Sequence, residues 1–382
     1  MKKLRVAYLT GSRADFGLMT PVLQALKKDS NFTLQVYYTG MHLLREFGNT
    51  KNEVVKLFPN SLCLSATNNQ DKPAAVANFN AKLLNLITKA LQANRPDYLL
   101  VLGDRSEMLV AALAAFYLQI PIVHLHGGDQ SATWDDAARN AISKLAHLHL
   151  PATRQAEARL KQMGEEPWRI KTVGAPAIEV IKQTKLLNRQ ALTKKLKIDL
   201  TKKYLLVTLH PVDSNLKEAK EQMKMVLTAA LSFQLSVIII YPNADPGGRA
   251  MISVIQTYKH KPQVYVFKSL SQPVFLSLAK HSSAWLSNSS AGVIESASLK
   301  TPVINIGNRQ QGRIKAKNVL SASYEIESLK KAIKTMQSHK FQLSLQTLKN
   351  PWGNGRTSQK VLNILKNIKI DKTLLTKISS PL

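Results

Sequence analysis

Short apolar runs alternate along this chain with longer stretches in which apolar residues recur at helical spacing. A strand of a parallel sheet is buried on both faces and is apolar throughout, whereas an amphipathic helix repeats its apolar positions every three to four residues. Apolar runs predict strands at 4–9, 34–39, 98–102, 120–125, 204–209, 236–241, 264–267, 284–287 and 302–306. Helical spacing follows the first run up to residue 28 and recurs at 71–92, 106–117, 136–147, 154–163, 216–231, 249–258, 273–281 and 293–299. Strands that alternate with helices favour doubly wound parallel sheets.

The alternation occurs twice, so the fold class is α/β with two Rossmann-like, doubly wound domains. We expect an N-terminal domain at 1–176, a basic linker at 177–201 and a C-terminal domain at 202–350. The last segment, 351–382, carries a helix that either caps the second domain or packs back on the first. Two such domains leave a cleft between their strand ends, where a ligand is expected.

The charge balance is strongly basic, with 53 Lys+Arg against 24 Asp+Glu and a formal net charge of +29. Such a balance raises nucleic acid, an anionic membrane surface and anionic substrates as partners. The lysines are spread along the chain, however, and no nucleic-acid motif is recognised. The densest stretch, 182–203, reads either as a solvated basic linker or as a docking face for an acidic partner.

The remaining composition points to the cytoplasm. The first apolar run spans about six residues, which is shorter than a signal-peptide core, and no run approaches the roughly 20 residues of a membrane span. The one cysteine, Cys63, excludes an intrachain disulfide and fits a reducing compartment. We expect Cys63 to be a small buried apolar residue.

Acidic residues follow the two predicted strands at 98–102 and 120–125. Asp104 comes after the first, His126 and Asp129 after the second, and Asp135 and Asp136 open the next helix. Carboxylates at one sheet edge, near glycines that expose N–H groups, suit proton transfer beside a bound phosphate. A single strand-end carboxylate is as readily a helix cap, and convergence of several favours a site. The spacing matches no zinc pattern, so no metal is expected.

Anion-friendly turns follow other strands. GSRADFG (11–17) places Arg13 at a helix start, and the absence of G-x-G-x-x-G weighs against NAD or FAD. TLHP ends with His210, and the turns YPNADPGGR (241–249), SNSSAGVIES (287–296) and NRQQGR (308–313) follow later strands. Ser and Gly at a helix start cradle phosphate well, although an ordinary helix cap has the same composition. Together these turns favour a diphosphate ligand.

Long blocks of the chain resemble the hydrolysing UDP-N-acetylglucosamine 2-epimerases of sialic-acid-type pathways. The blocks are GSRADFG, TGMHLLREFGNT, GDRSEML, HGG, AISKLAHLHLPAT, VGAPAIE, TLHPV, YPNADPGGR, NSSAGVIE, NIGNRQQGR and NPWGNGRTS. The resemblance covers nearly the whole chain and implies a glycosyltransferase-B-like fold with the UDP-sugar in the interdomain cleft. It implies loss of the C2 proton with anti elimination of UDP, giving 2-acetamidoglucal, and then hydration to N-acetylmannosamine. It also implies a homodimer and no cofactor.

Carried over by position, Asp104, Asp129, Asp135 and His210 are similar to the family's catalytic residues. We expect Asp104 or Asp129 to take the C2 proton and Asp135 to handle water. The predicted substrate contacts are Arg13, Asn243, Arg249, Ser289, Ser290, Gly292, Glu295 and Arg313. The family usually reads HGGE where this chain has HGGD (126–129), which retracts the carboxylate by about 1.5 Å. We expect activity to be retained; an inactive protein that Asp129→Glu restores would contradict this.

Three alternatives stay open at this point. The sugar could be a UDP-linked 2,4-diacetamido-2,4,6-trideoxyhexose of a legionaminic-type pathway, because the residues that read C4 and C6 are not identifiable from one chain. A glycosyltransferase on the same fold would release little UDP without an acceptor. A basic nucleic-acid-binding protein would bind with a steep salt dependence.

Overall fold

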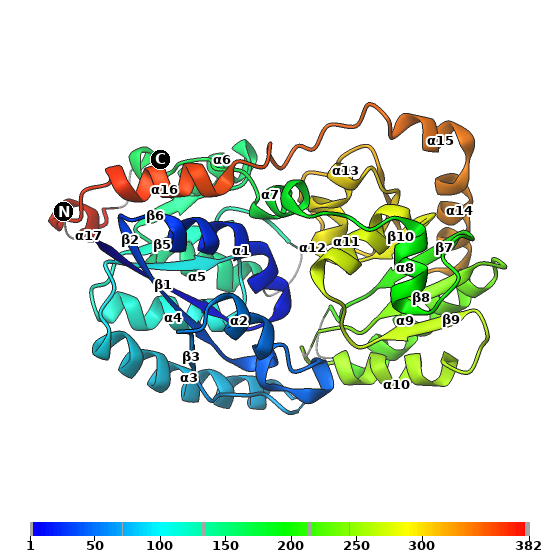
Figure 1. Cartoon of the computed structure of the whole chain (residues 1–382), viewed down its shortest axis with the longest axis horizontal. Coiled ribbons are helices and arrows are strands. Elements are labelled where there is room, and N and C mark those ends of the chain that lie inside the picture. The colour runs from blue at the N-terminus through cyan, green and yellow to red at the C-terminus, as the bar shows by residue number, and fades with distance from the viewer. Residues whose placement is uncertain (1–2, 71, 132–134, 213–214, 244, 379–382) are drawn as a thin grey trace.

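The computed structural model describes residues 3–70, 72–131, 135–212, 215–243 and 245–378. It contains two six-stranded parallel sheets that lie side by side, each covered by helices (Figure 1). Two doubly wound domains in tandem are the predicted fold class, and the architecture is glycosyltransferase-B-like. No helix within the described residues is long and apolar enough to cross a membrane.

The first sheet has the strand order β3-β2-β1-β4-β5-β6. Its strands are β1 (Leu4–Thr10), β2 (Phe32–Tyr38), β3 (Leu62–Cys63), β4 (Tyr98–Leu102), β5 (Ile122–Leu125) and β6 (Leu148–Leu150). Its helices are α1 (Arg13–Lys28), α2 (Lys51–Leu57), α3 (Pro73–Ala93), α4 (Ser106–Tyr117), α5 (Asp135–Leu145) and α6 (Arg154–Gln162), with 3-10 turns η1 (Gly40–Leu43), η2 (Arg45–Phe47) and η3 (Pro167–Arg169). Every residue of β4 is buried, because helices cover both faces of this central strand.

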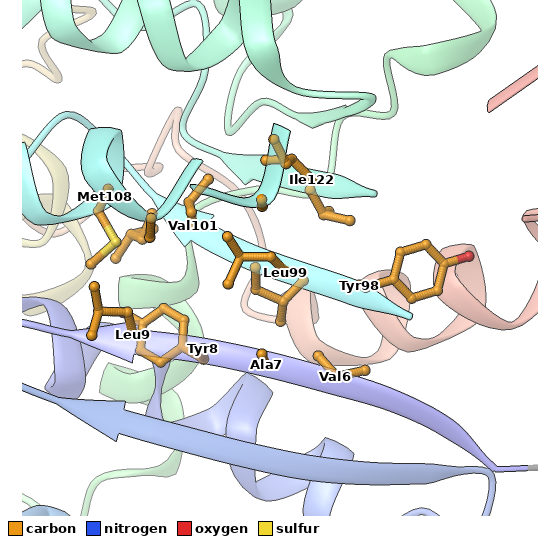
Figure 2. Close-up of a cluster of buried hydrophobic side chains, with 14 of the residues drawn as sticks. Val6, Ala7, Tyr8, Leu9, Tyr98, Leu99, Val101, Met108 and Ile122 are labelled. Atoms are coloured by element: carbon orange, nitrogen blue, oxygen red, sulfur yellow. The ribbon is translucent and has the colours of Figure 1, made fainter. Parts of the chain in front are cut away.

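Figure 2 shows the centre of this first core, where side chains of β1 and β4 such as Tyr8, Leu9 and Leu99 pack together.

The edge of this sheet is less buried than its centre. Cys63 was expected to be buried, but it is exposed because β3 is a two-residue edge strand. The elements α2 and β3 were not anticipated, since neither is long enough to show a clear period.

The second sheet has the order β12-β11-β10-β7-β8-β9, which repeats the topology of the first. Its strands are β7 (Tyr204–Thr208), β8 (Ser236–Ile240), β9 (Val264–Phe267), β10 (Ala284–Ser287), β11 (Val303–Ile306) and β12 (Val319–Ala322). Its helices are α9 (Leu216–Leu231), α10 (Gly248–Tyr258), α11 (Gln272–His281), α12 (Ser290–Ile294), α13 (Ser296–Leu299), α14 (Ile326–Gln337) and α15 (His339–Ser344). The predicted helix at 293–299 is two short helices, and β12, α14 and α15 were not anticipated.

The stretch 177–201, predicted as a basic linker, is folded into helices. It contains α7 (Pro176–Gln183) and α8 (Arg189–Leu196), and Ile181, Leu192 and Leu200 pack into a core beneath the second sheet. Five lysines make this stretch basic, but its apolar residues have helical spacing and bury one face.

The chain crosses between the domains a second time after α15 and ends on the first domain, as the red segment of Figure 1 shows. The helix α16 (Thr357–Asn367) packs on α1, and its Val361 and Leu365 belong to the first core. A short helix, α17 (Lys372–Leu375), follows it. In the crossing segment, Trp352 is 1% exposed and packs with Ile178 and Ile294, which joins the two domains beside the cleft.

Candidate active site

A cavity of about 420 Å³ lies between the two domains and is lined by both. In each sheet the strand order reverses between two neighbouring strands, β1 and β4 in the first and β7 and β10 in the second. The segments that follow these four strands carry Arg13, Asp104, His210 and Ser289, and all four residues line the cavity. Ligands of open parallel sheets bind where the order reverses, so this cavity is the candidate site.

Most residues predicted from the sequence line this cavity. They are Arg13, Asp104, Asp129, Asp135, His210, Asn243, Ser289, Ser290, Glu295 and Arg313. Arg249 and Gly292 are not among the lining residues. Arg249 donates to Glu46 at 2.5 Å, and Gly292 lies where a Cβ would meet Ser287 and Val303 at 3.3 Å, so it allows α12 to pack closely on the sheet.

Asp104 is held by an arginine that the sequence analysis did not single out. Arg139, on α5, donates to Asp104 Oδ2 and to Asp136 Oδ1, and its side chain is 1% exposed. Burial would raise the pKa of Asp104, but Arg139, followed by other arginines of the site, keeps that pKa below its ordinary value. Asp104 is therefore an ionised carboxylate facing the cavity.

Asp129 lies on a second short loop, after β5. Its Oδ2 is 2.7 Å from Nδ1 of His126, and because a carboxylate only accepts, Nδ1 carries the proton. Burial would raise the pKa of Asp129, and the hydrogen bond from His126 lowers it below the ordinary value. His126 has a left-handed backbone, with φ of 63°, and stacks on Trp352 at 6.2 Å between ring centroids. Asp129 is thus a second ionised carboxylate in a fixed orientation.

His210, at the end of β7, is neutral. The backbone N–H of Asn243 donates to His210 Nδ1 at 3.1 Å, which places the ring proton on Nε2. Burial, and then Arg309 and Arg105, lower the pKa of His210 to about 3. Asn288 holds the backbone on both sides, because its Oδ1 accepts from His210 N at 2.8 Å and its Nδ2 donates to His210 O at 2.7 Å. His210 is suited to donate a hydrogen bond and unsuited to act as a cation.

Arginines and hydroxyls gather on the second-domain wall. Ser289 caps α12, and Ser290 begins that helix. Arg309 lies 3.8 Å from Asp135, and Arg313 donates to the backbone carbonyl of Gln130 at 3.0 Å, so both reach across to the first domain. Positive charge and hydroxyl groups at this wall suit a phosphorylated ligand.

Glu295 is the exception on this wall, because it is buried without an arginine to balance it. Burial raises its pKa to about 8, so the carboxyl is protonated at neutral pH. A neutral carboxyl both donates and accepts hydrogen bonds. Glu295 therefore suits sugar hydroxyls better than it suits a cation.

Arg13 lies between the domains. Its guanidinium pairs with Glu53 and donates to Ser269 Oγ and, at 2.7 Å, to the carbonyl of Leu270. Arg13 was predicted as an anion contact from its place at a helix start, and it lines the cavity while it ties the two domains together. Its role toward a ligand stays a prediction.

The residues missed by sequence reasoning are those that hold the predicted ones. Arg139 follows Asp136 by three positions, so the two share a helix face, and this spacing was the available clue. Asn288 and Arg309 lie within motifs that were recognised, yet their partners are distant in sequence. Among the described residues, no group of three or more His, Cys, Asp and Glu is arranged to hold a metal ion.

A cleft between two doubly wound domains, lined by ionised carboxylates of the first domain and by arginines of both, defines an enzyme-like site for a phosphorylated sugar-sized ligand. The family model for UDP-N-acetylglucosamine 2-epimerase matches residues 24–366. This chain belongs to the UDP-N-acetylglucosamine 2-epimerase family.

Relatives align over most of their length. The chain is 38% identical over 381 residues to UDP-N,N'-diacetylbacillosamine 2-epimerase (hydrolyzing) of Legionella pneumophila, covering 98% of this chain and 99% of the relative. It is 33% identical to the GDP/UDP-N,N'-diacetylbacillosamine 2-epimerase (hydrolyzing) of Campylobacter jejuni, covering 98% of both. It is 30% identical to a UDP-N-acetylglucosamine 2-epimerase of Neisseria meningitidis, covering 86% of both.

A solved structure supports the fold. The Methanocaldococcus jannaschii UDP-GlcNAc 2-epimerase in complex with UDP-GlcNAc and UDP superposes with a TM-score of 0.81 at 21% identity, covering 95% of this chain and 99% of that one. At this identity the likeness establishes the architecture alone.

Proposed function

We infer that this protein is a hydrolysing 2-epimerase whose substrate is UDP-N,N'-diacetylbacillosamine, a UDP-linked 2,4-diacetamido-2,4,6-trideoxyhexose. The observation that carries the proposal is the 38% identity, over 98% of this chain, to the Legionella enzyme of that printed activity. Identity to the Neisseria UDP-N-acetylglucosamine 2-epimerase is 30% over 86% of the chain. The diacetamido sugar, an alternative at the sequence level, is therefore favoured over UDP-N-acetylglucosamine.

The first step of the proposed reaction needs a base at C2. A carboxylate removes the C2 proton, the C1–C2 double bond forms, and the C1–oxygen bond to UDP breaks, so UDP leaves with the electron pair. We assign the base to Asp104, because this carboxylate is ionised, lines the cavity and has a side chain that is 24% exposed, against 3% for Asp129. Water then adds its hydroxyl to C1 and a proton to C2, and Asp135 is the carboxylate that we assign to this hydration. Asp129 and its partner His126 complete the carboxylate wall.

Departing UDP needs hydrogen-bond donors and positive charge to stabilise its developing negative charge. The neutral His210 offers Nε2–H, and Arg309 and Arg313 supply charge on the same wall. A neutral histidine donates without first taking a proton from solvent, so its contribution is independent of pH above about 4. Ser289 and Ser290 lie on the same side and offer hydroxyls to the diphosphate.

An apolar part of the cavity wall fits the diacetamido sugar. The apolar side chains there include Met41, Leu44, Phe47, Val76 and Phe79, all from the first domain. The trideoxy sugar carries a C6 methyl group and a second acetyl methyl at C4, where N-acetylglucosamine carries hydroxyls. Met41, Leu44 and Phe47 lie within the block TGMHLLREFGNT that resembles the family, so Val76 and Phe79, which lie outside these blocks, are the candidates for substrate discrimination.

The test is turnover of both UDP-sugars by the purified protein in D₂O, followed by proton NMR. We expect UDP release with deuterium at C2 of the free sugar, and a kcat/KM at least about tenfold higher for the diacetamido sugar. Val76→Thr should narrow this preference several-fold, because the hydroxyl replaces a methyl facing the ligand. Val55→Thr is the matched control, since Val55 is 39% exposed on α2 and does not line the cavity.

The outcomes separate the alternatives. A higher kcat/KM for UDP-N-acetylglucosamine would assign that sugar as the substrate and overturn the proposed specificity. Absence of turnover with both sugars would overturn the reaction itself. UDP release only when a sugar acceptor is added would indicate a glycosyltransferase.

A further inference from the structure

Three acidic residues of the first domain, Asp104, Asp129 and Asp136, meet at one buried guanidinium, that of Arg139. One terminal nitrogen donates to Asp104 Oδ2. The other donates to Asp136 Oδ1 and, at 3.0 Å, to the backbone carbonyl of Asp129. Asp104 follows β4, Asp129 follows β5, and Asp136 lies at the start of α5. Arg139 therefore connects the segments that carry the predicted catalytic carboxylates.

We propose that Arg139 is a positioning residue for the elimination step, and that its guanidinium holds the Asp104 carboxylate at the cavity wall in the orientation that removes the C2 proton. This inference rests on the proposed function. The two carboxylates that Arg139 binds differ in position, because Asp104 lines the cavity and Asp136 does not. The backbone N–H of Ser131 donates to both Asp136 oxygens, at 2.8 and 2.9 Å. These two hydrogen bonds hold the Asp136 carboxylate in place. Asp136 in turn holds Arg139 in the position from which it orients Asp104.

The charges around this pair support the same role. Burial disfavours the charged form of Arg139, but the surrounding carboxylates, Asp104 first, keep its pKa above the ordinary value. Burial also disfavours the Asp104 carboxylate, and Arg139 is the largest of the charges that keep its pKa low. The other charged or titratable groups that face the pair are Asp129, Asp135, Asp136, His124, Arg105, Arg309 and Arg313. His124 is neutral, because burial lowers its pKa to about 3.

Two substitutions distinguish the effect of the Arg139 charge from the effect of its hydrogen-bonding geometry. Arg139→Gln removes the charge, so burial of Asp104 is no longer balanced by its main partner and the pKa of Asp104 rises. A proton on Asp104 blocks proton removal, so activity is then lost as pH falls through the raised pKa. Arg139→Lys keeps a positive charge, but an ammonium cannot hold Asp104, Asp136 and the Asp129 carbonyl together in fixed geometry.

The experiment measures kcat/KM from UDP release between pH 5 and 7 with the diacetamido sugar. We expect no acid limb assignable to Asp104 in the wild type. Arg139→Gln should be about 10²-fold slower or more and should gain an acid limb that the wild type lacks. Arg139→Lys should lose kcat without gaining the limb. Wild-type kcat in Arg139→Lys together with a wild-type pH profile in Arg139→Gln would overturn the proposal.

A matched control is available in Arg169, whose side chain is also 1% exposed. It donates to the backbone carbonyls of His147, Thr373, Leu374 and Thr376. None of these four residues lines the cavity. Arg169→Gln should lower the melting temperature and leave the pH profile of kcat/KM unchanged. If it reproduced the acid limb of Arg139→Gln, the limb would reflect general destabilisation and the proposal would fail.

A second readout needs no turnover. The ¹³C resonance of the Asp104 carboxyl, identified by its absence in Asp104→Asn, should titrate at higher pH in Arg139→Gln than in the wild type or in Arg139→Lys. An unchanged titration would overturn the proposal. A wild type that turns over neither sugar would overturn the proposed function instead, and the two failures are thus distinguishable.

Discussion

The two sheets of this protein have the same strand order, yet their ligand-facing ends carry different titratable groups. The first sheet contributes the ionised carboxylates Asp104 and Asp129, which lie beside the arginines Arg13, Arg105 and Arg139. At the β7/β10 end of the second sheet the side chains are neutral or basic, with His210 uncharged and Arg309 beside it. Shared topology therefore sets where a ligand lies, while the residues after each strand set what each end can do.

The two ends differ in whether neighbouring charges keep their buried titratable groups ionised. The first domain buries carboxylates and balances them with Arg139, which keeps them as bases. The second domain buries His210 and Glu295 so that both are neutral at pH 7, with pKa values of about 3 and about 8. Under the proposed reaction, the acidic wall removes a proton and the opposite wall receives the leaving diphosphate.

Loss of the acidic wall should have the largest effect. Asp104→Asn keeps the size of the side chain but removes the base, and we expect kcat to fall by about 10³-fold or more. Deuterium incorporation at C2 should stop with it. UDP should still bind, because the second domain is untouched.

If Asp104→Asn weakened UDP binding and left turnover unchanged, the assignment of proton removal to the first domain and of UDP binding to the second would be wrong. Asp199→Asn is the control, since Asp199 has a half-exposed side chain that bonds to Thr201 outside the cavity. Its kcat should equal that of the wild type in the same NMR assay.

Loss of the donor on the opposite wall should have a smaller effect. His210→Phe removes Nε2–H, and we expect kcat to fall by about 10²- to 10³-fold with little change in KM. Because the pKa of His210 is about 3, the wild-type pH profile between 5 and 8 should contain no step due to this group. A step near pH 6.5 that disappears in the variant would show that His210 acts as an acid with an ordinary pKa.

Glu295 should give the smallest effect. If ribose hydroxyls donate to its carboxylate, UDP binding favours the ionised form, so binding at pH 7 releases a proton from a group whose pKa is about 8. Affinity for UDP should therefore rise with pH from 7 to 8 by less than about tenfold. Calorimetry in two buffers of different ionisation enthalpy measures the proton release, and Glu295→Gln should abolish it. Equal proton release by the variant would exclude Glu295 as its source.

Much of the fold could be predicted because strands and helices reflect local spacing. The helix at 106–117 has the predicted bounds, as do the helix at 216–231 and the strand at 284–287. Short elements such as β3 and α2 were missed, because two to seven residues do not establish a period. The helices within the predicted basic linker at 177–201 were missed, because its lysines obscured a buried apolar face.

By itself, the sequence determined two doubly wound domains and the polar residues at their strand ends, since both depend on patterns within a few residues. Tertiary structure alone decided how those residues are paired and charged. Arg139 reaches Asp104 across 35 positions, and Asn288 holds His210 across 78. Burial and the nearness of opposite charges determine protonation, and both arise only when distant segments pack together.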